Sequence, residues 1–198
     1  MAEPGFVFSV PARDGRLLWF RPVVPADRSL LVEGYRHLSD DSRLKRFNAL
    51  YEELTSEQLR FLAELDYHDR YAWGVMIGPA DDREGAAMGR YARYRNPTAD
   101  GFIAADLGIT VLDKFQGIGI GTELVKALII TGHANGIDRF VTQVLARNDA
   151  MLGVFRLFGA EIGPVELGTV EVTVELAPAA ETLADHPLSK LIAGYWSA

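Results

Sequence analysis

Hydrophobic and polar residues follow one another in short alternating runs that predict a series of strands. The first two runs flank the Asp14-Gly15 dipeptide, which is a strong signal for a hairpin turn. The last run contains Gly168, so it predicts one final strand with a candidate break at that glycine. The predicted strands are residues 6–10, 17–21, 71–77, 86–94, 102–112, 139–145 and 165–176.

Capping residues and helical periodicity predict helices between these strands. Pro25-Ala26-Asp27, a Ser39 cap, and a capping box of Thr55 with Gln58 open three helices before the third strand. Asn135-Gly136 is a typical C-cap for the helix that follows the central glycines. The last two predicted helices are residues 148–158 and 185–196.

The chain is organised around a strand, a glycine turn and a helix within residues 104–136. The turn places Gly117, Gly119 and Gly121 at alternate positions directly before the helix. Glycine permits positive φ and the close approach of a ligand, and the first N–H groups of a helix have no partner within it. This arrangement suits a phosphate or pyrophosphate, and the alternative is a tight strand-to-helix turn without a ligand.

Two familiar nucleotide-binding patterns fail at this turn. A Rossmann G-x-G-x-x-G would need a third glycine where Thr122 stands, and predicted antiparallel strands rather than a parallel βαβ unit precede the turn. A P-loop would need a Gly-Lys-Ser/Thr triplet, which the chain lacks. Neither pattern therefore identifies the ligand of this turn.

The remaining pattern, Gln116-x-x-Gly119-x-Gly121, resembles the acetyl-CoA pyrophosphate loop of the GNAT family of N-acetyltransferases. The resemblance continues downstream, in an Asn-initiated helix that ends in glycine, and upstream, in two short phrases. Together these phrases look most like the acetyltransferase domain of bacterial protein-lysine acetyltransferases. The matching segments are residues 148–151, Gly159-Ala160, Phe20-Arg21-Pro22 and residues 38–47, and the similarity covers residues 15–177.

The resemblance implies an α/β (α+β) fold, the GNAT acyl-CoA N-acyltransferase fold. This fold would be a mixed, mostly antiparallel twisted sheet flanked by helices, with the cofactor wedged where two central strands splay. We expect a single domain over residues 1–198, an acetyltransferase domain at 15–177 and a helical C-terminal extension at 181–198. The aromatic-rich extension would dock on the body of the protein or on a second copy in a homodimer.

The resemblance makes acetyl-CoA the acyl donor and implies its contacts. Backbone N–H groups of the turn would bind the pyrophosphate, and the exposed backbone of Ile109 and Val111 would pair with the pantetheine arm. Asn148 would contact the same arm, and its alternative role is a plain helix N-cap. The expected cofactor-binding residues are Ile109, Thr110, Val111, Gln116, Gly117, Ile118, Gly119, Ile120, Gly121, Thr122 and Asn148.

Asp106 is the candidate catalytic base. By resemblance it stands where protein-lysine acetyltransferases carry a catalytic Glu, and a carboxylate inside an apolar strand is unusual. An attacking amine must lose a proton, and burial makes a carboxylate a better base. Asp is one methylene shorter than Glu, so it would act through a bridging water; the alternative is a carboxylate bonded to backbone. Phe155 occupies the position of a Tyr that many family members use as general acid, and it cannot donate a proton.

In the resembled fold, the helices before the third strand help to shape the acceptor pocket. Glu33, Tyr35, Arg36, Arg46 and Phe47 would face the acceptor, and the alternative is a solvated helix face with core aromatics. The acceptor would be a primary amine, either a protein lysine or a small molecule. Two other interpretations remain open: a degenerate domain that binds CoA as a sensor or protein-interaction module, and a different donor such as succinyl-CoA.

Composition narrows the function further. The 198-residue chain has a net charge of −7, which does not favour a nucleic-acid partner. It has no cysteine, so a thiol acyl-enzyme is excluded and direct transfer in a ternary complex is expected. The four histidines show no metal-binding spacing. We find no signal-peptide pattern or bilayer-spanning apolar run, so the expected location is the cytoplasm, without a membrane partner.

Overall fold

The computed structural model describes residues 8–47 and 52–196 of the chain. These residues form one eight-stranded sheet in the order β1-β2-β3-β4-β5-β6-β8-β7. Neighbouring strands are antiparallel except β5 and β6, so the sheet is mixed, as the resemblance implied. The strands are β1 (Phe8–Pro11), β2 (Leu17–Pro22), β3 (Arg70–Ile77), β4 (Glu84–Arg93), β5 (Ala104–Val111), β6 (Arg139–Leu145), β7 (Glu161–Glu166) and β8 (Thr169–Glu175).

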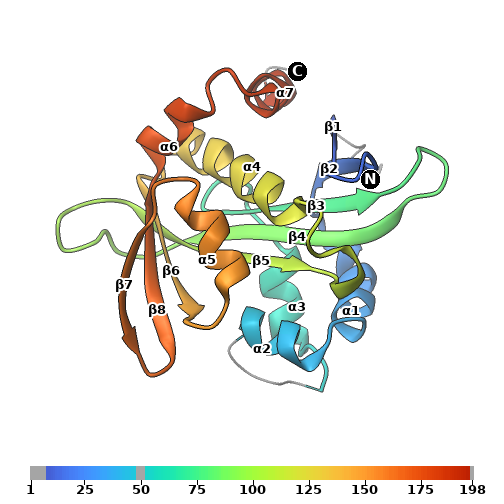
Figure 1. The fold of residues 1–198 in the computed structure, drawn as a ribbon, viewed down its shortest axis with the longest axis horizontal. Coiled ribbons are helices and arrows are strands. Elements are labelled where there is room, and N and C mark those ends of the chain that lie inside the picture. The colour runs from blue at the N-terminus through green and yellow to red at the C-terminus, as the bar shows by residue number, and fades with distance from the viewer. Residues whose placement is uncertain (1–7, 48–51, 197–198) are drawn as a thin grey trace.

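Helices cover both faces of this sheet (Figure 1). They are η1 (Pro25–Asp27), α1 (Arg28–Arg36), α2 (Asp40–Phe47), α3 (Ser56–Ala63), η2 (Asp113–Phe115), α4 (Ile120–Ala134), α5 (Asp149–Arg156), α6 (Leu176–Thr182) and α7 (Pro187–Trp196). Helix α4 packs on β3, β4 and β5, and α6 and α7 pack on α4. Helices α1, α2 and α3 lie on the opposite face (Figure 1). Among the described residues, no helix combines the length and apolar character needed to cross a membrane.

The parallel pair at the centre of the sheet separates almost as soon as it forms. Within the described residues the parallel register holds for Ala104 with Arg139 and for Ala105 with Phe140. Beyond these pairs β5 stays antiparallel to β4, while β6 continues antiparallel to β8. The two central strands therefore splay, as expected, and leave a gap in the sheet.

Several local sequence signals fold as predicted. In the capping box, Gln58 N–H donates to Thr55 Oγ1 at 3.2 Å and Thr55 N–H donates to Gln58 Oε1 at 2.7 Å. Ser39 Oγ accepts a hydrogen bond from the N–H of Ser42 at 3.3 Å, at the start of α2. Gly136 follows the end of α4 with φ +74°, as a left-handed C-cap requires. These caps place the helix ends close to their predicted positions.

The prediction of one final strand over residues 165–176 was wrong. The structure has two strands there, because β7 and β8 pair antiparallel. Leu167 and Gly168 have φ values of 49° and 83°, and two positive φ values in succession reverse the chain in a tight hairpin turn. The break expected at Gly168 is thus a full reversal. A two-residue turn hardly interrupts an alternation of period two, so the sequence pattern reads as continuous.

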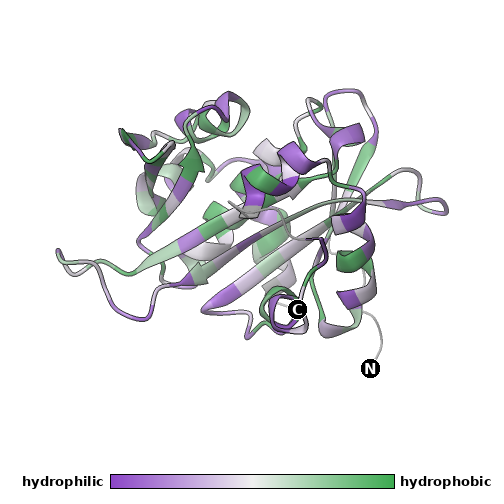
Figure 2. Ribbon diagram, turned by 90° about the horizontal axis from the view of Figure 1, so that it is seen from below, coloured by the Kyte–Doolittle hydropathy of each residue, from purple (hydrophilic) through white to green (hydrophobic). Residues whose placement is uncertain are grey.

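Aromatic side chains on the α4 face of the sheet form the centre of the core. Tyr71, Trp73, Tyr91 and Phe140 are each at most 2% exposed. Neighbouring rings lie 5.2 to 6.3 Å apart, and such pairs contribute about 1 kcal/mol each beyond the area they bury. Trp73 Nε1 donates a hydrogen bond to Thr131 Oγ1 at 3.0 Å, which ties α4 to the sheet. Hydrophilic residues gather in the projecting loops (Figure 2).

The C-terminal segment docks on the body of the protein. Ile192 of α7 is fully buried, and the Tyr195 ring lies 6.3 Å from the Trp73 ring. Helix α6, which the sequence did not predict, buries Leu176 beside α4. This helix is too short to show a helical period, so contact with α4 rather than local pattern explains it.

Candidate active site

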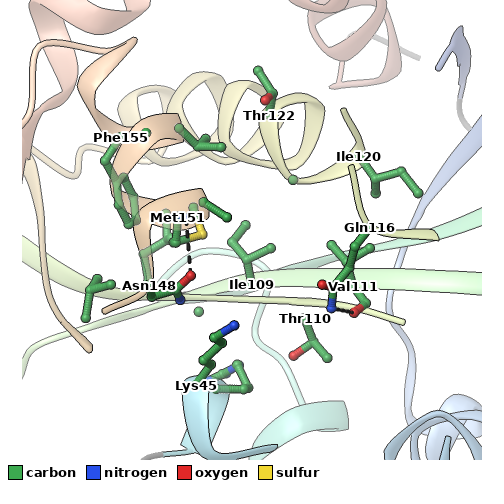
Figure 3. Close-up of a pocket in the computed structure, with 18 of the residues that line it drawn as sticks. Lys45, Ile109, Thr110, Val111, Gln116, Ile120, Thr122, Asn148, Met151 and Phe155 are labelled. Atoms are coloured by element: carbon green, nitrogen blue, oxygen red, sulfur yellow. Dashed lines mark hydrogen bonds between the residues drawn. The ribbon is translucent and has the colours of Figure 1, made fainter. Parts of the chain in front are cut away.

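The gap between β5 and β6 opens into a cleft of about 750 Å³. Its walls come from both strands, the start of α4, α5 and α2 (Figure 3). Of the residues expected to bind the cofactor, Ile118 does not line the cleft and packs against the hydrophobic core instead. The others do line it: Ile109, Thr110, Val111, Gln116, Gly117, Gly119, Ile120, Gly121, Thr122 and Asn148.

The glycine turn has the backbone conformation that the sequence predicted. Gly117 and Gly119 have φ values of +82° and +96°, and Gly119 is the left-handed N-cap of α4. A Cβ at Gly117 or Gly121 would meet no atom within 4 Å, so the turn faces open space. The first N–H groups of α4 have no partner within the helix and carry the positive end of its dipole. The turn therefore fits a diphosphate.

An arginine of the β1–β2 hairpin lies beside this turn. Arg13 N–H donates to the Ile118 carbonyl at 3.0 Å, which fixes the hairpin against the loop. The Cγ and Nε atoms of Arg13 lie 3.3 Å from the position that a Cβ would take at Gly119. The Arg13 side chain also lines the cleft, so its charge adds to the positive helix end. Sequence reasoning missed Arg13, because a turn residue carries no sign of which distant loop it will touch.

One edge of β5 faces the cleft with its backbone. Leu112 N–H donates to the Ala86 carbonyl on the β4 side, and successive residues of a strand direct their backbone groups to opposite edges. Leu107, Ile109 and Val111 therefore present theirs to the gap. Accordingly, the Val111 carbonyl accepts from Gln116 Nε2 at 3.2 Å. This is the edge that the pantetheine arm was expected to pair with.

Helix α2 is fastened to the loop between β5 and α4. Asp113 accepts hydrogen bonds from the Ser39 N–H at 2.9 Å and from the Ser39 and Ser42 hydroxyls at 2.8 Å each. Burial alone would raise the pKa of Asp113, but these hydrogen bonds outweigh it and lower that pKa. Gln116 Nε2 also donates to Ser42 Oγ at 3.1 Å. The first turn of α2 is thus held against the loop between β5 and α4.

Two further cations lie on α2 and on the segment after β6: Lys45 lines the cleft, and Arg147 directly precedes the cleft-lining Asn148. Lys45 extends from α2 toward β5 (Figure 3) and pairs with Asp41 at 2.6 Å. Arg147 lies 3.4 Å from the same carboxylate, and both partners are at least half exposed. Such exposed pairs contribute little stability, but they place positive charge near the cleft. Apart from its charge, neither residue carries a sequence signal that predicts a place in the site.

Asp106 lies where β5 begins to separate from β6, and its half-buried side chain lines the cleft. The Thr142 hydroxyl on β6 lies 2.9 Å from Asp106 Oδ1 and 3.0 Å from the Leu107 carbonyl, so its proton serves one of these acceptors or is shared. Tyr94 lines the same cleft and donates to the Val141 carbonyl at 2.9 Å. Burial and, next, the charge of Asp106 raise the pKa of Tyr94.

Arg46 and Arg90 lie near Asp106 on the sheet face opposite α4. The Arg46 guanidinium of α2 lies against Gly108, where any Cβ would collide with it. Arg90 of β4 pairs in register with Gly108, is 3% exposed and stacks 3.8 Å from the Phe61 ring. Burial lowers the pKa of Arg46, and burial and then the Arg46 charge lower the pKa of Arg90 to about 10. The Asp106 charge opposes both shifts.

Helix α5 supplies the wall of the cleft that faces β5. Asn148 Oδ1 accepts from the Met151 N–H at 3.3 Å, so Asn148 is a helix N-cap and also lines the cleft (Figure 3). Phe155, at the position of the family's Tyr, is 1% exposed and lines the cleft with an apolar ring. That position offers no proton donor.

The residues expected to face the acceptor divide between the cleft and a second cavity of about 310 Å³. Arg46 lines both, whereas Glu33 and the buried Tyr35 line the second cavity. Arg36, whose side chain is 61% exposed, instead forms a surface ion pair with Glu53. The Phe47 side chain lies outside the described part of the structure.

Comparisons with known proteins agree with this geometry. The family described as "Acetyltransferase (GNAT) domain" matches residues 17–161. The Acetyltransferase Pat of Mycolicibacterium smegmatis is 31% identical over 179 residues, which cover 87% of this chain and 50% of that protein. The crystal structure of the GNAT domain of S. lividans PAT has a TM-score of 0.75 at 29% identity and covers 85% of this chain and 96% of its own.

A more distant structure shares the fold. The Salmonella typhimurium protein yncA, solved with its cofactor acetyl-CoA, has a TM-score of 0.61 at 14% identity and covers 80% of this chain and 94% of its own. The chain spans about half the length of the M. smegmatis relative. Acetyl-CoA is the donor of the family, and the open glycine turn, the cleft-facing edge of β5 and the cleft fit it. The chain belongs to the GNAT family of N-acetyltransferases.

Proposed function

We propose that the protein transfers the acetyl group of acetyl-CoA to a primary amine, directly and within a ternary complex. The observation that carries this proposal is the carboxylate of Asp106, which lines the cleft where the two central strands part. A group at this place can reach an amine that approaches the end of the pantetheine arm. We expect the reaction to take place in the cytoplasm.

The chemistry follows from the groups around the cleft. A lysine-like ammonium has a pKa of about 10.4 and no free lone pair, so Asp106, directly or through a water, accepts its proton. A backbone N–H on the open edge of β5 polarises the thioester carbonyl as the amine attacks. The leaving thiol has a pKa of about 8.5, so it departs as a thiolate without an acid at the position of Phe155.

The acceptor is a protein lysine or a small amine. A protein lysine is supported by the sequence phrases at residues 38–47, which resemble those of protein-lysine acetyltransferases. The second cavity, at about 310 Å³, supports a small molecule. Both acceptors would use the same base.

Replacing Asp106 with Asn tests the assignment. We expect Asp106→Asn to lower kcat by on the order of 100-fold or more, because the amide cannot accept the proton. The affinity for acetyl-CoA should stay unchanged, since Asp106 does not contact the glycine turn. Thiol release with a lysine-rich protein and a panel of amines measures the rate, and calorimetry measures binding.

Asp81→Asn is the matched control, because Asp81 is an exposed turn residue between β3 and β4. It should leave both quantities unchanged. Equal rates for wild type and Asp106→Asn would remove Asp106 as the base. Binding of acetyl-CoA without turnover on any amine would instead identify a domain that binds CoA without catalysis.

A further inference from the structure

The second cavity and the cleft between β5 and β6 share two lining residues. Arg46 and Thr110 line both spaces, so the cavity approaches β5 from the face opposite α4. Most of its wall is apolar, with Leu31, Leu62 and Met88 among the lining side chains. A molecule in this cavity would therefore reach the acyl end of the cleft past the Arg46 guanidinium.

The sheet makes room for this guanidinium at one position. A side chain at Gly108 would occupy the space that Arg46 fills, so the glycine allows an arginine of α2 to lie flat on β5. Asp106, two residues before Gly108 on β5, has its side chain on the same face of the sheet. The cation and the proposed base thus stand side by side where the two spaces join.

Positive charge exceeds negative charge around this junction. Arg90 is 3% exposed, and in the described part of the chain its Nε and Nη2 have no hydrogen-bond partner. Asp106 is the acidic group whose negative charge raises the pKa of both Arg46 and Arg90, against the effect of burial. Among the described residues, one carboxylate facing the buried Arg90 and the half-buried Arg46 leaves a net positive charge, which favours an anionic ligand.

The other acidic groups of the second cavity do not neutralise this charge. Asp27 forms a two-point ion pair with Arg21, at 2.5 and 2.7 Å. Glu84 is paired with Lys114, and Glu33 is exposed on α1. The Arg46 end of the cavity therefore keeps its preference for an anion.

We propose that Arg46 binds a carboxylate of the acceptor, so that the acceptor is a small amine that carries its own carboxylate. Its amino group would then lie at Asp106, and its apolar part would lie along the leucine and methionine wall. This inference rests on the proposed function, because it takes Asp106 as the base. A lysine side chain within a protein carries no such carboxylate.

A comparison of amino acids with their amides tests the proposal. With acetyl-CoA as donor, wild type should acetylate L-leucine with a kcat/KM on the order of 10 to 100 times that for L-leucinamide, because the amide removes the charge-assisted hydrogen bond. Arg46→Gln should bring this ratio close to one while acetyl-CoA affinity stays unchanged. Gly108→Ala should do the same, since it displaces the guanidinium without removing its charge. Arg36→Gln, on the surface of α1, should keep the ratio.

Binding provides a readout that needs no turnover. Calorimetry of N-acetyl-L-leucine and its amide on the CoA-bound protein should show the same preference in wild type and its loss in Arg46→Gln. If nothing is acetylated but this preference appears, the proposed catalysis fails and the carboxylate site stands. Equal binding of acid and amide, or a preference that survives Arg46→Gln, overturns the site. A wild-type preference for succinyl-CoA over acetyl-CoA that Arg46→Gln abolishes would assign the carboxylate to the donor and also overturn it.

Discussion

Arg13 and Arg16 belong to the same hairpin, yet their surroundings differ. Arg16 is paired with Asp14 at 2.7 Å and lies over the Phe115 ring at 5.4 Å. Arg13, in the described part of the chain, has no carboxylate within ion-pair distance and lies against Gly119 at the start of α4. Its side chain is thus available for a negatively charged group at the glycine turn.

Arg13→Gln should weaken the binding of acetyl-CoA about tenfold, equivalent to about 1.4 kcal/mol. The lost interaction is a charge-assisted hydrogen bond to a phosphate, so the loss should shrink at high salt. Isothermal calorimetry at two salt concentrations measures both effects. Arg16→Gln serves as the control on the same hairpin, and equal affinities for the two variants would speak against a phosphate contact by Arg13.

At the residue scale, the sequence predicted cleft-lining residues that belong to one continuous motif. All of residues 116–122 except Ile118 line the cleft, and they could be predicted because glycine spacing before a helix has a direct meaning for the backbone. Arg13 and Arg90 could not be assigned in this way. One comes from a hairpin far away in the chain, and the other is an arginine on a strand, where charge normally indicates a solvated face.

At the element scale, α2 is the helix of the site that depends most on hydrogen bonds to residues outside itself. It has eight residues, and its first turn is held by Asp113 through Ser39 and Ser42. Its other end carries Lys45 and Arg46 into the cleft. The position of these cations therefore depends on hydrogen bonds at the start of the helix rather than on helix propensity.

Asp113→Asn should loosen α2 without unfolding the sheet. The amide loses the negative charge and one of the acceptors that hold Ser39 and Ser42, so amide hydrogen exchange in residues 40–47 should quicken and KM for the acceptor should rise. In wild type this anchoring is present above the ordinary pKa of 3.8 and is lost as pH falls through the lowered pKa of Asp113. Asp40→Asn, with a side chain that is 83% exposed, is the control. Unchanged exchange in Asp113→Asn would show that packing alone holds α2.

Elements were predictable where a local signal marks both ends. Capping residues located α3 and the end of α4, and the Asp14-Gly15 turn located the first hairpin. The β7–β8 hairpin was missed because its two-residue turn preserves the alternation of apolar and polar residues. Helix α6 was missed because it is held by contacts with α4 and is too short to show a helical period in its own sequence. Tertiary contacts are not visible in a single short segment.

At the scale of the whole molecule, the C-terminal helices pack against α4, the helix that carries the glycine turn. His186, between α6 and α7, connects them: its Nε2 lies 3.1 Å from Lys126 Nζ on α4, and its Nδ1 lies 3.2 Å from the Leu188 N–H. Both neighbours are donors, whereas a protonated imidazole has no acceptor to offer. Burial and then the Lys126 charge lower the pKa of His186, and Glu123 opposes them.

The free energy of unfolding should therefore depend on His186. The folded protein binds a proton on His186 less tightly than the unfolded chain does. The contribution of His186 to the free energy of unfolding is therefore fully present above about pH 6.5, and it is lost as pH falls through the lowered pKa of the folded state. His186→Gln should remove this part of the pH dependence, measured by denaturant unfolding between pH 7.5 and 5. An identical pH slope in the variant would show that the C-terminal helices dock without a proton-linked contribution.

The halves of the central sheet are joined in parallel by two pairs of residues at one end, and beyond these pairs the facing edges of β5 and β6 form no backbone ladder with each other. A sheet in which β5 and β6 paired along their whole length would be stiffer, but its β5 edge could not form hydrogen bonds to a pantetheine arm. A ligand that fills the missing strand binds the folded form alone, so its abundance adds to the free energy of unfolding. The free energy of unfolding should thus rise with the concentration of the thioester that we propose as the acyl donor.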